Sequence, residues 1–325
     1  MLKKKKSILL LFFVVITGPF MLHSQDLTYS QFYANPLYLN PALAGAESCP
    51  RIHLNYRNQW PSLPGAFVSY AASFDGYSDF LHGGYGIQFD YNKAGEAAIS
   101  RMAVNAMYAY RLLISEKFTG HLAVQAGYGQ RSLQWKELIF ASGNNPATDD
   151  PDFTGNLSYL DFATGFLIGY GEKYFFGGAV HHLSQPDIAF AGNGEFPLNM
   201  KITVHGGANV GGERRRGRSG GAQVMISPNV LYQQQGQYRH LNLGSYFTVE
   251  PFVAGIWYRH AFENPDAVII SLGLSGEQYR IGYSYDYTLS GLSNASGGAH
   301  EISLAWIFDC DKKRKRPRAI KCPTF

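Results

Sequence analysis

Large apolar residues alternate with small or polar ones over long stretches of this 325-residue sequence. In QYRIGYSYDYTL, residues 278–289, every second position from Tyr279 to Leu289 is aromatic or aliphatic. The positions between them, from Arg280 to Thr288, are small or polar. A period of two places successive side chains on opposite faces of a β-strand, so the pattern predicts strands with one apolar face. It recurs in residues 51–60, 100–114, 266–275 and 300–308.

The length of these stretches separates two all-β classes, the soluble sandwich and the membrane barrel. Many run for about ten residues or more, which suits a tilted crossing of a bilayer, whereas strands in soluble proteins average about five or six residues. Tyrosines near the strand ends resemble the aromatic girdles of membrane barrels. Charged residues make up 16% of the chain, below the soluble average of about 25%. After residue 25 no apolar run is long enough for a spanning helix. The sequence predicts a transmembrane antiparallel β-barrel of the outer membrane and excludes a helical membrane protein.

We expect fourteen strands, an even number as in bacterial single-chain barrels, with twelve or sixteen as open alternatives. They are predicted at residues 52–60, 66–75, 83–92, 99–114, 118–135, 159–170, 173–182, 200–210, 221–233, 238–248, 251–262, 266–275, 277–289 and 299–308. With a periplasmic N-terminus, short connections fall on the periplasmic side and the longest connections fall outside. The short connections are 115–117, 171–173, 249–250 and 276–277, and the outer loops are 136–158, 183–199 and 290–298.

The first 25 residues have the form of a secretory signal peptide, with four lysines, an apolar core and a polar stop at Ser24–Gln25. A membrane anchor is the alternative reading. Cleavage removes four lysines and no acid, which brings the formal charge from +4 to zero. The tail from Asp311 to Lys321 holds seven basic residues and one acid. We therefore divide the chain into a signal peptide (1–25), a plug-like segment (26–50), a barrel (51–308) and a basic periplasmic tail (309–325).

The segment QFYANPLYLNPALAG, residues 31–45, contains Asn-Pro twice. Proline fixes its own φ and disfavours the helical region for the residue before it, so Asn35 with Pro36, and Asn40 with Pro41, predict a bent segment that is neither helix nor ordinary strand. Each Asn side chain can cap its own turn. Because large apolar residues crowd the segment, we expect Tyr33 to Leu43 to tuck into the periplasmic mouth of the barrel and partly close it. A disordered leader is the alternative.

Charges of both signs are expected on the inward face of the barrel. The cations are Arg51, Arg57, Arg101, Arg111, Arg131, Arg259 and Arg280, and the acids are Asp75, Asp90, Asp161, Asp286 and Glu301. An ion-selective pore would show one prevailing sign at its constriction. The mixture instead predicts a lumen that is internally paired.

Two basic segments are expected on the periplasmic side, the tail and the connection 211–220 with Arg214, Arg215 and Arg216. They read either as solvated charge runs or as a surface that docks an acidic partner or the anionic cell wall. Cys310 and Cys322 flank the tail and could form a disulfide, and Cys49 is expected to be solitary.

Signals for chemistry are weak. The sequence has no GxSxG, HExxH or P-loop motif and no paired CxxC, so we expect no enzyme activity, no cofactor and no metal site. His181 and His182, close to Ser184 and Asp187, form the best enzymatic candidate because some barrel enzymes that trim lipids use Ser and His.

Several motifs together resemble the PorP/SprF family, outer-membrane proteins of the type IX secretion system in the Bacteroidetes lineage. They are NPLYLNPALAG (35–45), NYRNQWP (55–61), FVSYAASFD (67–75), GYGQRSLQW (127–135), HHLSQPD (181–187) and YDYTLSGLSNASGGAHEISLAW (285–306). The resemblance implies an integral barrel without known enzyme activity that helps to export a secreted protein or holds it on the cell surface, as with gliding adhesins. The basic tail after Phe308 has no counterpart in the family pattern.

The resemblance and the charge pattern together select candidate structural or partner-binding residues. These are Asn35, Pro36, Asn40, Pro41, Arg57, Trp60, Arg214, Arg215, Arg216, Asp286, His300 and Glu301. The expected partners are a cognate secreted protein with a type IX C-terminal domain, other secretion-system components, the lipid bilayer and, through the basic segments, peptidoglycan, and no nucleic acid. The alternative function is a passive outer-membrane channel for hydrophobic or small solutes.

Overall fold

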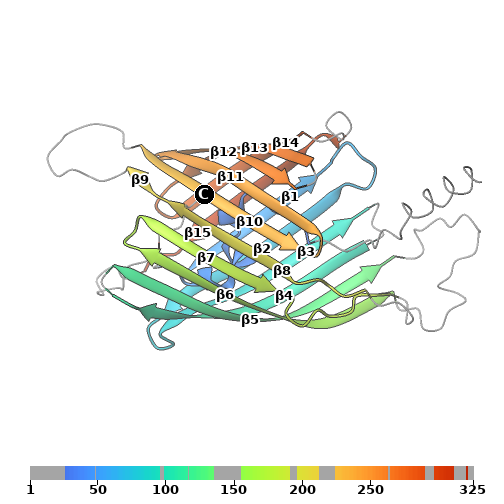
Figure 1. Ribbon diagram of the computed structural model, residues 1–325, viewed down its shortest axis with the longest axis horizontal. Helices are drawn as coiled ribbons and strands as arrows, with labels where there is room; N and C mark the ends of the chain where they lie inside the picture. Colours follow the sequence, from blue (N-terminus) through green and yellow to red (C-terminus); the bar gives the residue numbers. More distant parts are fainter. Residues whose placement is uncertain are drawn as a thin grey trace, which may run out of the picture.

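The computed structural model shows a closed barrel of fourteen antiparallel strands with one short extra strand (Figure 1). It describes residues 26–47, 49–95, 99–115, 117–134, 155–190, 196–211, 224–262, 264–289, 296–310 and 320. The fourteen barrel strands pair in chain order, with β8 paired directly to β10, and β15 pairs with β1 to close the ring. The expected fold class and strand number are confirmed.

The strands lie close to their predicted positions. They are β1 (Arg51–Gln59), β2 (Phe67–Ser78), β3 (Gly83–Ala94), β4 (Ile99–Leu113), β5 (Phe118–Leu133), β6 (Asn156–Tyr170), β7 (Tyr174–His181), β8 (Lys201–Ala208), β9 (Val210–Gly211), β10 (Met225–Gln235), β11 (Tyr238–Val249), β12 (Phe252–Ala261), β13 (Asn264–Ser275), β14 (Tyr279–Thr288) and β15 (Ala299–Ile307). The predicted strand 200–210 is split, because β9 continues it as a separate short piece that pairs with β10.

Alternation along each strand sorts side chains between lipid and lumen, and β14 shows the sorting clearly. Ile281 and Tyr287 are 46% and 54% exposed on the outer surface, whereas Ser284 and Asp286 are at most 1% exposed. Apolar surface exposed to water is unfavourable, whereas the same surface in contact with lipid is not, so the outward faces form the membrane-contacting band.

The two ends of the barrel differ in their connections. At one end, which we call the short-turn end, the connections include 114–117, 171–173 and 250–251. The opposite end, which we call the long-loop end, carries the connections 134–155 and 182–200. In outer-membrane barrels short turns face the periplasm and longer loops face outward, which gives the orientation used below. Residues 135–154, 191–195 and 290–295 of the predicted outer loops lie outside the described residues.

Residues 29–46 lie inside the barrel as a plug made of three single turns. These are the 3₁₀ turn η1 (Phe32–Ala34), the one-turn helix α2 (Pro36–Leu39) and the 3₁₀ turn η2 (Pro41–Leu43). The expectation that the segment contains no helix was wrong, because Pro at the first position of a turn is compatible with helix initiation. None of the helices among the described residues is long and apolar enough to cross a membrane.

The two Asn-Pro pairs act differently within the plug. Asn40 is extended, with φ −159° and ψ 121°, and its Oδ1 accepts a hydrogen bond from the backbone N–H of Ala42 at 2.9 Å. This is the capping geometry expected before a proline-initiated turn. Asn35 precedes α2 without a side-chain cap, and it is fully buried.

The plug runs through the barrel from the long-loop end to the short-turn end. Asp26 contacts Lys201, the first residue of β8, and Gln235, the last residue of β10, both at the long-loop end. Glu47 pairs with Arg51 at the start of β1 and with Arg280 near the start of β14, at the short-turn end. Residue 26 therefore lies toward the outer opening, which differs from the periplasmic N-terminus assumed for the strand count, whereas Leu43, whose carbonyl accepts a hydrogen bond from Arg51, lies toward the short-turn end. Because the segment contacts the wall at both ends of the barrel, it crosses the whole lumen.

A disulfide joins Cys49, just before β1, to Cys310, just after β15. The expectation that Cys49 is solitary was wrong, and Cys310 does not form the disulfide with Cys322 that the sequence left open. Because β1 and β15 are hydrogen-bonded neighbours in register Arg51 with Ile307, the ring itself brings Cys49 and Cys310 together.

Candidate functional site

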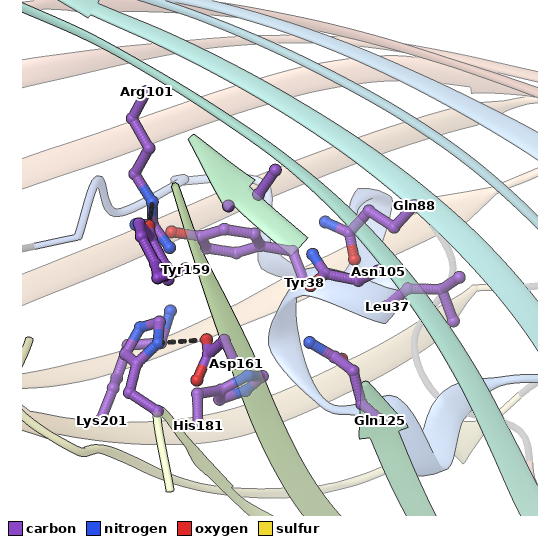
Figure 2. A pocket seen from close by; sticks show the side chains of 13 residues that line it. Leu37, Tyr38, Gln88, Arg101, Asn105, Gln125, Tyr159, Asp161, His181 and Lys201 are labelled. Carbon is purple, nitrogen blue, oxygen red and sulfur yellow. Dashed lines mark hydrogen bonds and ion pairs between the residues drawn. The ribbon is translucent and has the colours of Figure 1, made fainter. Parts of the chain in front are cut away.

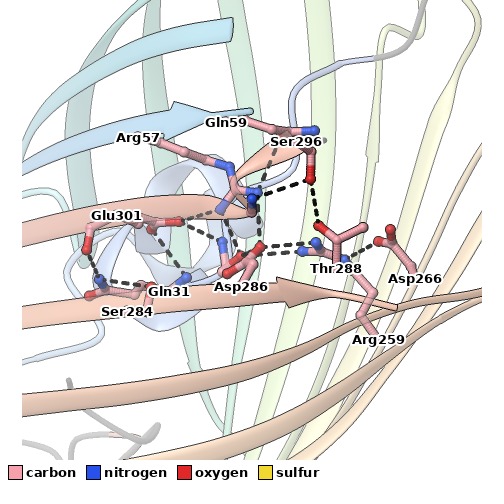
Figure 3. Close-up of polar contacts among 12 residues, drawn as sticks. Gln31, Arg57, Gln59, Arg259, Asp266, Ser284, Asp286, Thr288, Ser296 and Glu301 are labelled. Carbon is pink, nitrogen blue, oxygen red and sulfur yellow. Dashed lines mark hydrogen bonds and ion pairs between the residues drawn. The ribbon is translucent and has the colours of Figure 1, made fainter. Parts of the chain in front are cut away.

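Two carboxylates of the barrel wall hold the beginning of the plug. Glu301 accepts hydrogen bonds from the backbone N–H groups of Ser30, at 2.7 Å, and Gln31, at 3.1 Å. Asp286 accepts a hydrogen bond from the Ser30 hydroxyl at 2.6 Å. Figure 3 shows Gln31 lying between Glu301 and Ser284 on the neighbouring strands. The acids thus satisfy plug groups that have no partner in a regular secondary structure.

Two arginines neutralise these carboxylates, and we call the four side chains the Glu301 clamp (Figure 3). Arg57 contacts Asp286 at 3.0 Å and Glu301 at 3.2 Å, while Arg259 contacts Asp286 at 2.9 Å. Arg57 lies directly opposite Glu301 across the β1–β15 seam. Each of these side chains is buried, so removing a single partner would leave an uncompensated charge in the lumen.

A second charged cluster holds Asp26, and we call it the Asp26 clamp. The Asp26 carboxylate pairs with Arg101, with Lys201 at 2.9 Å and with Nε2 of His182 at 2.8 Å. The other ring nitrogen of His182 contacts Asp161 of β6 at 2.6 Å. Figure 2 shows Arg101, Lys201 and Asp161 around Tyr38 of α2, so wall and plug share this cluster.

Burial and charge act in opposite directions in the Asp26 clamp. Burial alone would raise the pKa of Asp26, but the adjacent Arg101, Lys201 and His182 hold that pKa well below its usual value. Burial alone would lower the pKa of His182, but Asp26 and Asp161 outweigh it and raise the pKa. Both effects favour a charged Asp26–His182 pair.

The proposed hydrolase arrangement around Ser184 does not form. The two ring nitrogens of His182 face Asp161 and Asp26, and the Ser184 hydroxyl lies 3.2 Å from the carbonyl of Leu160 and 3.3 Å from Asp161. A serine nucleophile needs a hydrogen bond to a basic ring nitrogen, which is absent at this pair. Among the described residues, no group of three or more His, Cys, Asp or Glu side chains is arranged to hold a metal ion.

The plug meets the wall through close apolar packing toward the short-turn end. Phe32 packs edge-on against Trp257 at a ring separation of 4.9 Å, and Tyr33 packs against Phe175 at 5.7 Å. Leu37 is fully buried. A Cβ at Gly84 would lie 2.0 Å from the carbonyl oxygen of plug residue 44, so glycine is required where the two backbones touch.

Polar atoms of the wall also close this half of the lumen. The Arg111 guanidinium donates to the carbonyl of Gly45 at 2.7 Å, and the Gly45 N–H donates to Asp75 at 2.9 Å. Asn40 donates to the carbonyl of Phe166 at 3.0 Å. These contacts pair polar groups of the plug with the wall, as a seal against water favours, although the buried side-chain amide of Asn35 makes no hydrogen bond.

A cavity of about 470 Å³ lies at the long-loop end, and residues 26–28 form part of its lining. Its apolar lining comes from Trp60, Phe67, Ile99, Ile188 and Leu198, and its cationic lining comes from Arg57, Lys93, Arg101, Arg131 and Arg259. This volume lies within the usual range of ligand sites, about 300–1,000 Å³. The lumen thus consists of a sealed half and a half that opens into a cationic cavity.

The structure brings most of the candidate residues to the plug or its clamps. Asn35, Pro36, Asn40 and Pro41 form turns of the plug, and Arg57, Asp286 and Glu301 form most of the Glu301 clamp. Trp60 lines the cavity, and its backbone N–H donates to the carbonyl of Gly298 at 2.8 Å.

Two groups of candidates lie elsewhere. His300 contacts the hydroxyl of Tyr283 at 2.8 Å on the outward side of the wall, away from the clamps. Arg214, Arg215 and Arg216 lie outside the described residues.

Sequence reasoning missed the plug side of both clamps. Asp26, Ser30 and Gln31 precede the Asn-Pro pairs and carry no motif of their own. A usable signal was present in the wall: the inward row contained acids and arginines at matching levels of adjacent strands, so a polar segment between them could have been anticipated.

Comparisons with solved structures give barrels of low sequence identity. The toluene transporter TbuX of Ralstonia pickettii and the toluene transporter TodX of P. putida each show 11% identity and a TM-score of 0.47. Each comparison covers 83% of this chain, with 91% of TbuX and 92% of TodX. The outer membrane protein Omp33 of Acinetobacter baumannii shows 9% identity and a TM-score of 0.45, covering 81% of this chain and 100% of that one.

The sequence comparisons are of two kinds. No curated protein sequence matches this chain. The model of the family described as type IX secretion system membrane protein PorP/SprF matches residues 21–306, which span the plug and the whole barrel. The chain therefore belongs to the PorP/SprF family of outer-membrane components of the type IX secretion system.

Proposed function

We propose that this chain assists the export or surface anchoring of a cognate secreted protein, through protein binding without an enzymatic step. The observation that carries the proposal is the filled lumen. Residues 29–46 occupy the barrel interior, and Leu37, Ala42 and Ala44 are fully buried. A sealed barrel offers no open route for solute flux, so its useful surfaces are its two ends.

The long-loop end is the surface on which we place the secreted partner. Connections 134–155 and 182–200 join strands at that end, and Ile188 and Leu198 of the second connection line the cationic cavity. Loops on a rigid scaffold are the usual sites of recognition. The C-terminal domain of a type IX substrate, arriving at the outer face, would meet these loops first.

Deletion of the gene tests the export role. We expect at least one secreted protein with a type IX C-terminal domain to disappear from the surface proteins of the deletion strain. Full-length chain supplied from a plasmid should restore it. A variant with residues 136–153 replaced by a Gly-Ser linker of equal length should reach the outer membrane but fail to restore display. An unchanged set of surface proteins in the deletion strain would contradict the proposal.

A passive channel for small or hydrophobic solutes is the competing function, and the cavity at the long-loop end is the observation that favours it. Planar bilayers separate the two functions, because a plugged anchor should conduct no more than background. Large, reproducible conductance from the unmodified chain would support the channel instead.

On the periplasmic side we propose contact with other secretion components or with peptidoglycan. The support is the sequence alone: the tail and the connection with Arg214, Arg215 and Arg216 are strongly basic, and anionic polymers attract such segments. These residues lie outside the described part of the chain. Sedimentation of the purified protein with peptidoglycan, lost on truncation after Cys310, tests this contact.

A further inference from the structure

One row of inward-facing side chains crosses four adjacent strands at the wall of the cationic cavity. Ser69 of β2 lies opposite Asn92 of β3, Asn92 lies opposite Arg101 of β4, and Arg101 lies opposite Arg131 of β5. All four side chains line the cavity. We call them the cavity row.

The two arginines of the cavity row differ in their partners. Arg101 is neutralised by Asp26 of the plug. Arg131 donates to the carbonyl oxygen of Ile188 at 3.0 Å and lies 5.0 Å from the ring centre of Phe190, and among the described residues it forms no ion pair. Like charges directly opposite each other on neighbouring strands repel. A carboxylate at Arg131 would relieve this repulsion.

The other two members of the cavity row carry polar atoms without partners. The hydroxyl of Ser69 and the side-chain oxygen of Asn92 are buried and make no hydrogen bond. Unpaired buried polar atoms are costly, and such exceptions call for an explanation. Both residues line the cavity, so rotation of the Ser69 side chain about χ1 and of the Asn92 amide about χ2 would turn these atoms toward a ligand with N–H groups lying along the row.

The remaining lining of the cavity is apolar. Trp60 and Phe67 pack edge-on at 5.4 Å on one side, and Ile188 and Leu198 lie in the connection between β7 and β8. Lys93 is a further cation of the lining, on the strand β3 that carries Asn92. The cavity therefore combines an unpaired guanidinium, hydrogen-bond acceptors and an apolar wall.

We propose that the cavity row binds the carboxy-terminal end of a partner polypeptide with apolar side chains. The terminal carboxylate contacts Arg131, backbone N–H groups donate to Asn92 and Ser69, and the side chains pack on the apolar wall. A plain acyl carboxylate would leave Asn92 and Ser69 unpaired, so a peptide fits the lining better. The inference rests on the proposed function, because it names the chemical feature by which a secreted partner is held.

Calorimetric titration of the full chain in a non-ionic detergent tests the proposal without any variant. The probes are an N-acetylated Ala-Leu-Phe tripeptide with a free carboxylate, the same peptide as its C-terminal amide, and octanoate. A hydrogen bond to a charged group contributes about 1.5–3 kcal/mol, so the amide should bind about tenfold or more weakly than the acid. Equal affinities of acid and amide would overturn the proposal, and so would binding of octanoate with no binding of the peptide.

Variants then locate the site. Arg131→Gln should weaken binding of the free acid about tenfold, and Arg131→Lys should retain part of the affinity because the charge remains. Arg239→Gln is the matched control, since Arg239 is an exposed arginine at the same end that does not line the cavity. Each variant is checked for the gel shift of a folded barrel before titration. Affinity unchanged in Arg131→Gln would overturn the assignment.

The result of the peptide titrations can be distinguished from the result of the gene-deletion experiment. Peptide affinity together with unchanged surface proteins in the deletion strain would retain the site and remove the export role. Loss of a surface protein in that strain, without peptide affinity in the purified chain, would retain the role and remove the site.

Discussion

The two halves of the lumen hold the same plug by different physics. Toward the short-turn end, α2 and η2 are held by apolar packing and by backbone contact at Gly84, and charged side chains of the wall contact only the end of the segment, at Gly45 and Glu47. Toward the long-loop end, the plug is held by the Glu301 clamp and the Asp26 clamp, next to a cavity. Apolar packing does not depend on protonation and is not weakened by charge screening, whereas ion pairs near an aqueous opening respond to both pH and ionic strength. We therefore expect the attachment of the plug to be insensitive to conditions in the half toward the short-turn end, which we call the inner half. In the half toward the long-loop end, which we call the outer half, we expect it to depend on pH and ionic strength.

Loss of Arg57 should produce the largest effect, because it removes the main cation of the Glu301 clamp. Arg57→Leu leaves Glu301 buried without its ion-pair partner, and breaking one side of a buried pair costs about 3–5 kcal/mol. Urea unfolding of the purified barrel, followed by tryptophan fluorescence, measures this loss. Arg239→Gln, a change of an exposed arginine, should stay within about 0.5 kcal/mol. Equal stability of the two variants would show that the clamp contributes nothing to the outer half.

A methyl group at Gly84 should disturb the inner half. Because its nearest neighbours would be backbone atoms of the plug at 2.0 and 2.5 Å, Gly84→Ala forces the plug to move. Overpacking of this kind costs about 1–3 kcal/mol, and we expect new conductance in planar bilayers. Gly120→Ala is the control, since its nearest contact, at 3.5 Å, is ordinary. If neither variant conducts above background in planar bilayers, the backbone contact at Gly84 is not part of the seal.

A change of pH should give the smallest effect, and we expect it to act on the Asp26 clamp. The pKa of His182 is raised above its usual 6.5, so its contribution is complete below about pH 6.5 and is lost as the pH rises through the raised value. The pKa of Asp26 is lowered, so its contribution fails only in acid, as the pH falls through the lowered value. Hydrogen-exchange protection of residues 26–29, corrected for intrinsic rates, should therefore fall above pH 6.5. In His182→Gln this fall should vanish, and a fall of equal size in the variant would exclude His182 as its cause.

The barrel could be read from the sequence because alternation is a local property. The predicted strand 277–289 became β14, Tyr279–Thr288, and the inward residues Arg280 and Asp286 face the lumen as expected. Each strand needs its own side chains sorted between lipid and lumen, so the pattern survives without knowledge of distant residues.

What the sequence missed depended on contacts between distant residues. The Cys49–Cys310 bond follows only when the first and last strands are placed side by side, which ring closure implies but no local pattern states. The direction of the plug depends on where Asp26 finds its cations on β4 and β8, far along the chain. The prolines of the plug predicted its bends and gave no direction.

The covalent link between Cys49 and Cys310 has a mechanical consequence. It turns the chain between these residues into a macrocycle with a sequence separation of 261, and the basic tail leaves that macrocycle directly after the link. A tension applied through the tail would be borne by a covalent crosslink before it could peel β15 from β1. A molecule that tethers a load on one side of a membrane to machinery on the other gains resistance to rupture at its weakest strand boundary.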